Sequence, residues 1–223
     1  DACIELDLYV IADWHVLGEK NPLLYKEYAK DFFDKVIDHY GDIPNIIYEI
    51  ANEPFSSWDD MVAYSNEMRP YIREKLPNSV ILVGGDFTGK TSDLDYANIM
   101  FVPHIYGVTG DVINRIISYI QDEVPIFVTE FGVTTSVDWA RANPESAAIM
   151  MPEYADRLIR FMDKYDISWT NWAVGCNPGY PLVQRGMWNN ELRDDTLNPS
   201  GVYIKSIFKK TRDLSYLDNI SDL

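Results

Sequence analysis

The chain has 223 residues, of which 47% are hydrophobic and 24% are charged, a composition typical of a soluble globular protein with a sizeable core. Its 19 basic and 35 acidic side chains leave a formal net charge of −16, and so negative a field repels phosphate backbones and anionic lipid headgroups. We therefore expect neither nucleic acid nor a membrane as a partner, whereas a neutral substrate is compatible with this charge.

Short apolar runs alternate with longer segments of helical periodicity along the chain, which indicates a repeating βα unit. The apolar runs are mostly continuous, as expected when both faces of a parallel strand are covered. In chain order, strands are predicted at Tyr9–Trp14, Asn45–Ala51, Ser79–Gly84, Ile99–Ile105, Pro125–Thr129 and Ile167–Ala173. Helices are predicted at Leu23–Tyr40, Trp58–Leu76, Asp111–Asp122, Pro144–Tyr165 and Val202–Lys210, and the first six residues read as the end of a helix.

Polar residues gather where the predicted strands end. They are Asp13-Trp14-His15, Asn52-Glu53, Asp86, His104 with Tyr106, Glu130, and Asn171-Trp172. In (β/α) barrels the catalytic groups lie at the C-terminal ends of the strands. No glycine-rich nucleotide-binding motif opens a predicted helix. The pattern therefore favours an α/β fold of the TIM (β/α)8 barrel type, here incomplete with about six βα units, over an open doubly wound sheet.

Two glutamates stand out among these residues. Glu53 ends one predicted strand, and Glu130 ends the strand three further on. Glycoside hydrolysis requires two carboxylates flanking one bond, one protonated to assist the leaving oxygen and one ionised to attack the anomeric carbon. Asn52 is placed to hydrogen-bond a sugar hydroxyl, and Tyr106 could donate a hydrogen bond to the attacking carboxylate.

Five motifs at successive strand ends carry a resemblance to a known family. They are Asp13-Trp14-His15, Ile50-Ala51-Asn52-Glu53-Pro54, His104-Ile105-Tyr106, Thr129-Glu130-Phe131-Gly132 and Asn171-Trp172. Their order and approximate spacing, from about residue 1 to residue 210, resemble family 5 of the glycoside hydrolases, in clan A. The chain is similar in particular to bacterial endo-β-1,4-glucanases (cellulases).

The resemblance implies a function and a role for each motif residue. Glu53 would be the acid/base and Glu130 the nucleophile of a retaining double displacement on β-1,4-glucan, such as cellulose or carboxymethylcellulose. The residues implied to hold the sugar are His15, Asn52, His104 and Tyr106, with Trp172 as the stacking floor. No cofactor and no metal is implied, and a secreted location follows from where such a substrate occurs.

The chain also departs from the family pattern. Members have eight βα units, and Asp13-Trp14-His15 normally closes the third strand, so the first two strands have no counterpart here. The arginine that usually ends the second strand and supports the nucleophile is also without a counterpart, and Ala173–Arg185 departs from the usual loop. We interpret residues 1–223 as a single catalytic domain, N-terminally truncated relative to the family. Since unpaired strand edges invite pairing, we expect a homo-oligomer that covers the missing barrel strands.

Two alternative functions stay open at this point. One is hydrolysis of another β-glycan, such as mannan, xyloglucan or mixed-linkage glucan. The other is a catalytically weak carbohydrate-binding remnant, which the absent arginine favours, whereas the presence of both glutamates favours catalysis.

The remaining polar and aromatic candidates have simpler interpretations. A metal site is disfavoured, since Asp13, the two motif histidines and the two glutamates lack the local spacing of zinc or calcium motifs. Asp13 is predicted to be a supporting hydrogen-bond acceptor. Trp58 and Trp188 are either outer sugar platforms or loop packing, and Cys3 and Cys176 are predicted to be unpaired thiols.

Overall fold

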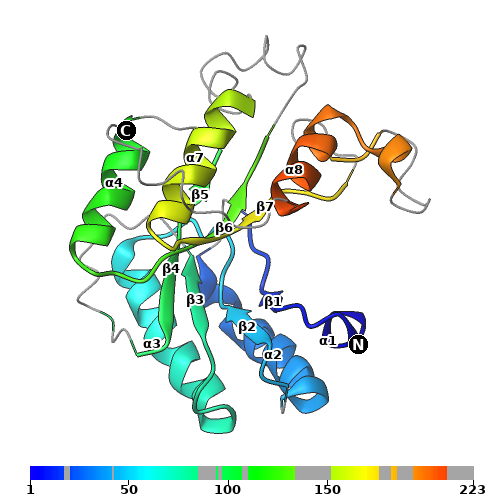
Figure 1. Ribbon diagram of the computed structural model, residues 1–223. Helices are drawn as coiled ribbons and strands as arrows, with labels where there is room; N and C mark the ends of the chain where they lie inside the picture. Colours follow the sequence, from blue (N-terminus) through cyan, green and yellow to red (C-terminus); the bar gives the residue numbers. More distant parts are fainter. Residues whose placement is uncertain are drawn as a thin grey trace. The chain divides into compact units, whose positions relative to one another are not determined.

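Figure 1 shows the computed structural model of the chain, which describes residues 1–17, 21–41, 43–84, 94, 97–106, 110–133, 152–175, 182–184 and 193–209. The chain divides into two compact units. The first comprises Asp1–Pro103 with Gln121–Phe127, and the second comprises His104–Ile120 with Val128–Leu223.

The first unit contains a parallel four-stranded sheet in the order β1-β2-β3-β4. Its strands are β1 (Val10–Asp13), β2 (Ile46–Glu49), β3 (Ile81–Gly84) and β4 (Ile99–Val102). All four residues of β3 are buried, which explains the continuous apolar run that predicted this strand. Strand β1 lies at an edge of the sheet and is half-buried, and Asp13 pairs in register with Glu49 of β2. The polar residues that follow β1 and β2 therefore emerge at the same end of the sheet.

The helices of the first unit are α1 (Ala2–Glu5), the 3-10 turn η1 (Pro22–Tyr25), α2 (Lys26–Tyr40) and α3 (Trp58–Lys75). Helix α2 buries one face, with Ala29, Phe33 and Ile37 four residues apart. Ser57 caps α3 by accepting a hydrogen bond from the backbone N–H of Asp60. Helices α2 and α3 lie side by side (Figure 1).

Ion pairs join α2 to α3 on their solvent-facing side. Glu67 of α3 accepts from Lys26 at 2.7 Å and from Lys30 at 2.6 Å. Asp34 of α2 accepts from Lys75 at 2.8 Å and from the Tyr71 hydroxyl at 2.7 Å. These donors, with Lys26 as the main one for Glu67 and Lys75 for Asp34, hold the pKa of each carboxyl below its ordinary value.

The lowered pKa values predict acid sensitivity of this helix pair. A carboxyl whose pKa is depressed on folding stabilises the protein above its unfolded pKa, and this stabilisation is lost as the pH falls through the folded pKa. We expect the α2–α3 contribution to weaken as the pH falls below the ordinary values of 4.5 for Glu67 and 3.8 for Asp34. Urea unfolding across this window should show Glu67→Gln less stable than the wild type near neutral pH, by about 1 kcal/mol at most for partly exposed pairs. The difference in the free energy of unfolding should disappear at the lowest pH of this window.

Glu74→Gln, at an exposed glutamate of the same helix, is the matched control. A Glu67→Gln difference in stability that persists at low pH would contradict the assignment of the ion pairs.

The second unit contains the strand order β5-β6-β7, formed by His104–Ile105, Phe127–Phe131 and Ser168–Asn171. Strands β5 and β6 are parallel, with His104 in register with Glu130. Strand β7 is tied to β6 by the Thr170 hydroxyl, which donates to the Thr129 carbonyl, and by the Trp172 N–H, which donates to the Phe131 carbonyl at 2.8 Å. Its helices are α4 (Gly110–Gln121), α7 (Pro152–Lys164), the 3-10 turn η3 (Asp194–Thr196) and α8 (Pro199–Lys209).

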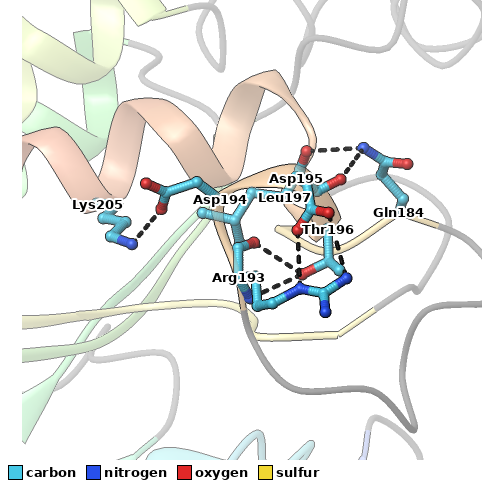
Figure 2. Close-up of polar contacts among 7 residues, drawn as sticks. All are labelled: Gln184, Arg193, Asp194, Asp195, Thr196, Leu197 and Lys205. Carbon is cyan, nitrogen blue, oxygen red and sulfur yellow. Dashed lines mark hydrogen bonds and ion pairs between the residues drawn. The ribbon is translucent and has the colours of Figure 1, made fainter.

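Polar contacts connect η3, the turn that precedes α8, with Gln184 and with Lys205 of α8 (Figure 2). The Arg193 guanidinium donates twice to the Asp195 carboxylate, at 3.0 and 3.2 Å, and Lys205 of α8 forms an ion pair with Asp194. Gln184 donates to the carbonyls of Asp195 and Leu197, at 3.2 and 3.0 Å. These contacts join residues 182–184 to the turn that precedes α8.

The predicted elements agree with the structure except at particular boundaries. The predicted strand Ile99–Ile105 is two strands, β4 and β5, interrupted at Pro103, which has no N–H to donate to a ladder. Strand β6 lies two residues later than predicted, so Glu130 lies within a strand rather than after it. Helix α8 begins three residues before the predicted start, because Asn198 caps it by accepting from the Gly201 N–H and Pro199 fits its first turn.

One predicted helix lies partly outside the described residues. Residues 144–151 of the predicted fourth helix lie outside the described residues, and α7 begins at Pro152.

Among the helices that the structure describes, none has the length and hydrophobicity needed to cross a membrane.

Candidate active site

In the first unit, a hydrogen-bonded chain links the ends of β1 and β2. His15 Nδ1 lies 2.7 Å from Asp13 Oδ2, and His15 Nε2 lies 3.4 Å from Asn52 Nδ2. Because an ionised carboxylate only accepts, Nδ1 carries the proton and Nε2 accepts from the amide of Asn52. Asp13 is thus the supporting acceptor that the sequence predicts, and it sets both the tautomer and the orientation of the imidazole.

The backbone after β2 is held against the segment after β1. The N–H of Asn52 donates to the Trp14 carbonyl at 3.2 Å, and the N–H of Glu53 donates to the Val16 carbonyl at 3.2 Å. Asn52 is buried, and its amide also donates to the Val16 carbonyl at 3.3 Å. The Glu53 residue is half-buried, four positions beyond the end of β2. Its main chain is therefore fixed, while the residue as a whole remains partly accessible to solvent.

In the second unit, Glu130 of β6 is the centre of a compact polar cluster. The Glu130 residue is 6% exposed, and the Tyr106 hydroxyl donates to Glu130 Oε2 at 2.5 Å. His104 Nδ1 lies 3.5 Å from the same oxygen, and His104 Nε2 lies 3.1 Å from the Thr129 hydroxyl. Pairing of β5 with β6 brings His104 and Glu130 into register, so the backbone itself positions this cluster.

Trp172, directly after β7, presents an aromatic ring to solvent. Its residue is 37% exposed, although its N–H is bonded to Phe131 and the neighbouring Asn171 amide donates to the same carbonyl at 3.0 Å. In contrast, Trp169 is packed between Phe131 and Phe208. An anchored backbone with an exposed indole offers a flat apolar face for a ligand ring.

The structure therefore divides the predicted site residues between the two units. Within the first unit it brings His15 and Asn52 together beside the main chain of Glu53. Within the second unit it brings His104, Tyr106 and Glu130 together, and Trp172 follows the neighbouring strand.

Two buried polar residues were not singled out from the sequence as candidate site residues. Thr129 contacts His104, and nothing in the sequence distinguishes it from an ordinary β-branched strand residue. Glu49 is 2% exposed within β2, and a carboxylate inside an apolar run is a signal that could have marked it, because buried carboxylates need partners.

The tryptophans and cysteines have clearer positions than the sequence allowed. Trp14 packs on Phe32 of α2, with ring centroids 5.6 Å apart, and Trp58 is half-buried in the first turn of α3. Cys3 is a half-buried free thiol, whereas Trp188 and Cys176 lie outside the described residues.

Comparison with known proteins identifies the family. The sequence model of the cellulase family, glycosyl hydrolase family 5, matches residues 1–178. The chain belongs to glycosyl hydrolase family 5.

Bacterial endoglucanases are similar along most of the chain. Endoglucanase A of Evansella cellulosilytica is 32% identical over 95% of the chain and 44% of its own length. An endoglucanase of Clostridium saccharobutylicum is 35% identical over 91% of the chain and 46% of its own length. The chain thus spans less than half the length of these relatives.

Solved structures of family 5 enzymes confirm the predicted fold class, a (β/α) barrel type that is incomplete here. The catalytic domain of Thermobifida fusca endoglucanase Cel5A superposes with a TM-score of 0.78 at 26% identity, covering 93% of the chain and 72% of that domain. A variant of the same domain, solved in complex with cellotetraose, gives a TM-score of 0.75 over 91% of the chain.

Proposed function

We propose that the chain hydrolyses internal bonds of β-1,4-glucan by a retaining double displacement. The observation that carries the proposal is the buried carboxylate of Glu130 with the Tyr106 hydroxyl 2.5 Å away, in a chain that belongs to a cellulase family. The relatives named above are endoglucanases, and the Thermobifida fusca domain was solved with a β-glucan oligosaccharide.

Glu130 is assigned the role of nucleophile. Its ionised carboxylate attacks the anomeric carbon, the bond to the leaving glycosyl oxygen breaks, and a covalent glycosyl-enzyme forms. Donation from Tyr106 and register pairing with His104 hold the carboxylate in one orientation, which an aligned attack requires.

Glu53 is assigned the role of acid/base. It gives its proton to the departing oxygen in the first step, and in the second step it takes a proton from the water that cleaves the glycosyl-enzyme. A half-buried residue on a fixed main chain suits a group that must exchange protons with water between steps. The mechanism requires the two carboxyl groups to lie about 5–5.5 Å apart, and it predicts retention of anomeric configuration.

The remaining predicted residues are assigned to substrate binding. His15, Asn52 and His104 supply hydrogen-bonding groups for sugar hydroxyls, and the exposed ring of Trp172 supplies a stacking face. The net charge of −16 does not disfavour a neutral polysaccharide.

Reducing-sugar release from carboxymethylcellulose, lichenan and mannan tests this proposal. We expect release from carboxymethylcellulose by the wild type, with the first product in the β configuration by NMR. Preference for mannan would favour the other-β-glycan alternative. Retained glucan binding with no release from any polymer would favour the carbohydrate-binding remnant and overturn the proposed activity.

We also propose a homo-oligomer that covers the exposed edge of β1, and secretion, because cellulose lies outside cells. The segment leading into β1 exposes Leu6, Leu8 and Tyr9, at 67%, 50% and 75%. Exposed apolar residues beside an edge strand favour association. Sedimentation of the purified chain should show a dimer or larger species, and a monomer at all concentrations would contradict the oligomer.

A further inference from the structure

The main chain of residues 50–53, which carries Asn52 and Glu53, is held by both neighbouring strands of the first unit. On one side, the Ile50 N–H donates to the Leu82 carbonyl of β3 at 3.1 Å. On the other side, the N–H groups of Asn52 and Glu53 donate to the segment that follows β1. These bonds fix the amide groups of the segment.

Helix α3 supplies a further support through Tyr64. The Tyr64 hydroxyl donates to the Ile50 carbonyl at 2.7 Å, and both residues are fully buried. Burial raises the pKa of Tyr64, so the hydroxyl remains a donor throughout the range in which the protein is folded. A buried carbonyl that loses its donor carries the full cost of its desolvation, so the peptide group after Ile50 is strongly held in this orientation.

Gly84, at the end of β3, lies in close contact with the carbonyl groups that follow Ile50. A Cβ placed on Gly84 would lie 2.2 Å from the Ala51 carbonyl oxygen and 2.5 Å from the Asn52 carbonyl oxygen. The segment therefore packs directly against the backbone of β3 and cannot shift further in that direction. A rotation of the peptide group after Ile50 must then shift the residues that follow it, Asn52 and Glu53.

We infer that Tyr64 is a positioning residue for Glu53, acting through the Ile50 carbonyl from the core of α3. The inference rests on the proposed role of Glu53 as acid/base. It assigns a catalytic consequence to a helix residue that has no contact with substrate. Loss of the hydroxyl lets the peptide after Ile50 rotate, which displaces the carboxyl of Glu53 from the departing oxygen.

The test compares two aryl β-cellobiosides that differ in their need for a general acid. The bond to phenol breaks with protonation by the acid, whereas 2,4-dinitrophenolate departs without it. Since kcat/KM reports the first chemical step, Tyr64→Phe should lower kcat/KM for the phenyl substrate about tenfold and for the dinitrophenyl substrate by less than about twofold. A general loosening of the structure would lower both values equally.

Tyr71→Phe is the matched control. Tyr71 lies on the same helix and donates a hydrogen bond of the same length, 2.7 Å, to Asp34 of α2. We expect it to leave the ratio of the two kcat/KM values unchanged. Unfolding midpoints of both variants establish that the assays are run on folded protein.

A double-mutant cycle supplies a second readout. In a Glu53→Gln background, Tyr64→Phe should have no further effect on the phenyl substrate, because the group through which Tyr64 acts is already gone. Equal losses on both substrates in the single variant, or a full additional loss in the double variant, would overturn the inference while the proposed function stands. A wild-type chain inactive on both substrates and on carboxymethylcellulose would overturn the proposed function, and the inference with it.

Discussion

Replacing Glu130 by glutamine is expected to lower glucan hydrolysis by about 10³-fold or more, because an amide cannot attack the anomeric carbon. Glutamine keeps the shape of the side chain and an oxygen that can accept from Tyr106, so the cluster with His104 should remain folded. Binding of cello-oligosaccharides should therefore persist while hydrolysis is lost, as calorimetry and reducing-sugar release together would show.

Asp166→Asn is the matched control for this variant. It makes the same change from carboxylate to amide in the second unit, at an exposed residue with φ of 52°, a conformation that asparagine tolerates well. It should leave activity unchanged. A 2-deoxy-2-fluoro cellobioside with an activated leaving group should also label the wild type at Glu130, and a covalent adduct on any other residue would refute the assignment.

Replacing Glu53 by glutamine is expected to give the second largest loss, about 10²- to 10⁴-fold on polymeric glucan, the usual contribution of a general acid. The expected signature differs from that of Glu130. With 2,4-dinitrophenyl β-cellobioside the first step proceeds without acid, so kcat/KM should stay near the wild-type value while the glycosyl-enzyme accumulates and gives a burst of dinitrophenol.

Azide provides the discriminating measurement for Glu53. As an anion it attacks the glycosyl-enzyme without base assistance, so it should restore turnover of the Glu53→Gln variant and yield the β-glycosyl azide. The wild type, whose base is intact, should show no comparable gain. Absence of both the burst and the azide product would show that Glu53 does not act as the acid/base.

The strands and their polar ends could be predicted from the sequence because both depend on local patterns. Continuous apolar runs identified β1 to β3. The polar residues that follow the predicted strands in the sequence identified the members of the two clusters. Pro103 divided one predicted strand because its missing N–H outweighs the hydrophobic pattern around it. The start of α8 depended on a cap at Asn198 that lies outside the periodic segment.

Contacts across the fold could not be predicted in this way. Tyr64 reads from the sequence as one apolar residue of a helix face, and only the folded chain brings its hydroxyl to the Ile50 carbonyl, 14 positions away. The partners of Glu67 likewise depend on how α2 meets α3, since Lys26 lies 41 positions before it. Periodicity determines which face of a helix is buried but gives no information on which atoms that face meets.

The close approach at Gly84 has a consequence for saturation mutagenesis. The atom that collides with the Ala51 and Asn52 carbonyls is Cβ, which every other residue carries. All substitutions at this position should therefore score alike, alanine as badly as tryptophan, whatever their polarity or size. If variants with small residues at Gly84 stay active in such a scan, the backbone after β2 must be able to shift to accommodate a Cβ. The main chain that carries Glu53 would then be the part of the fold that adapts to mutation.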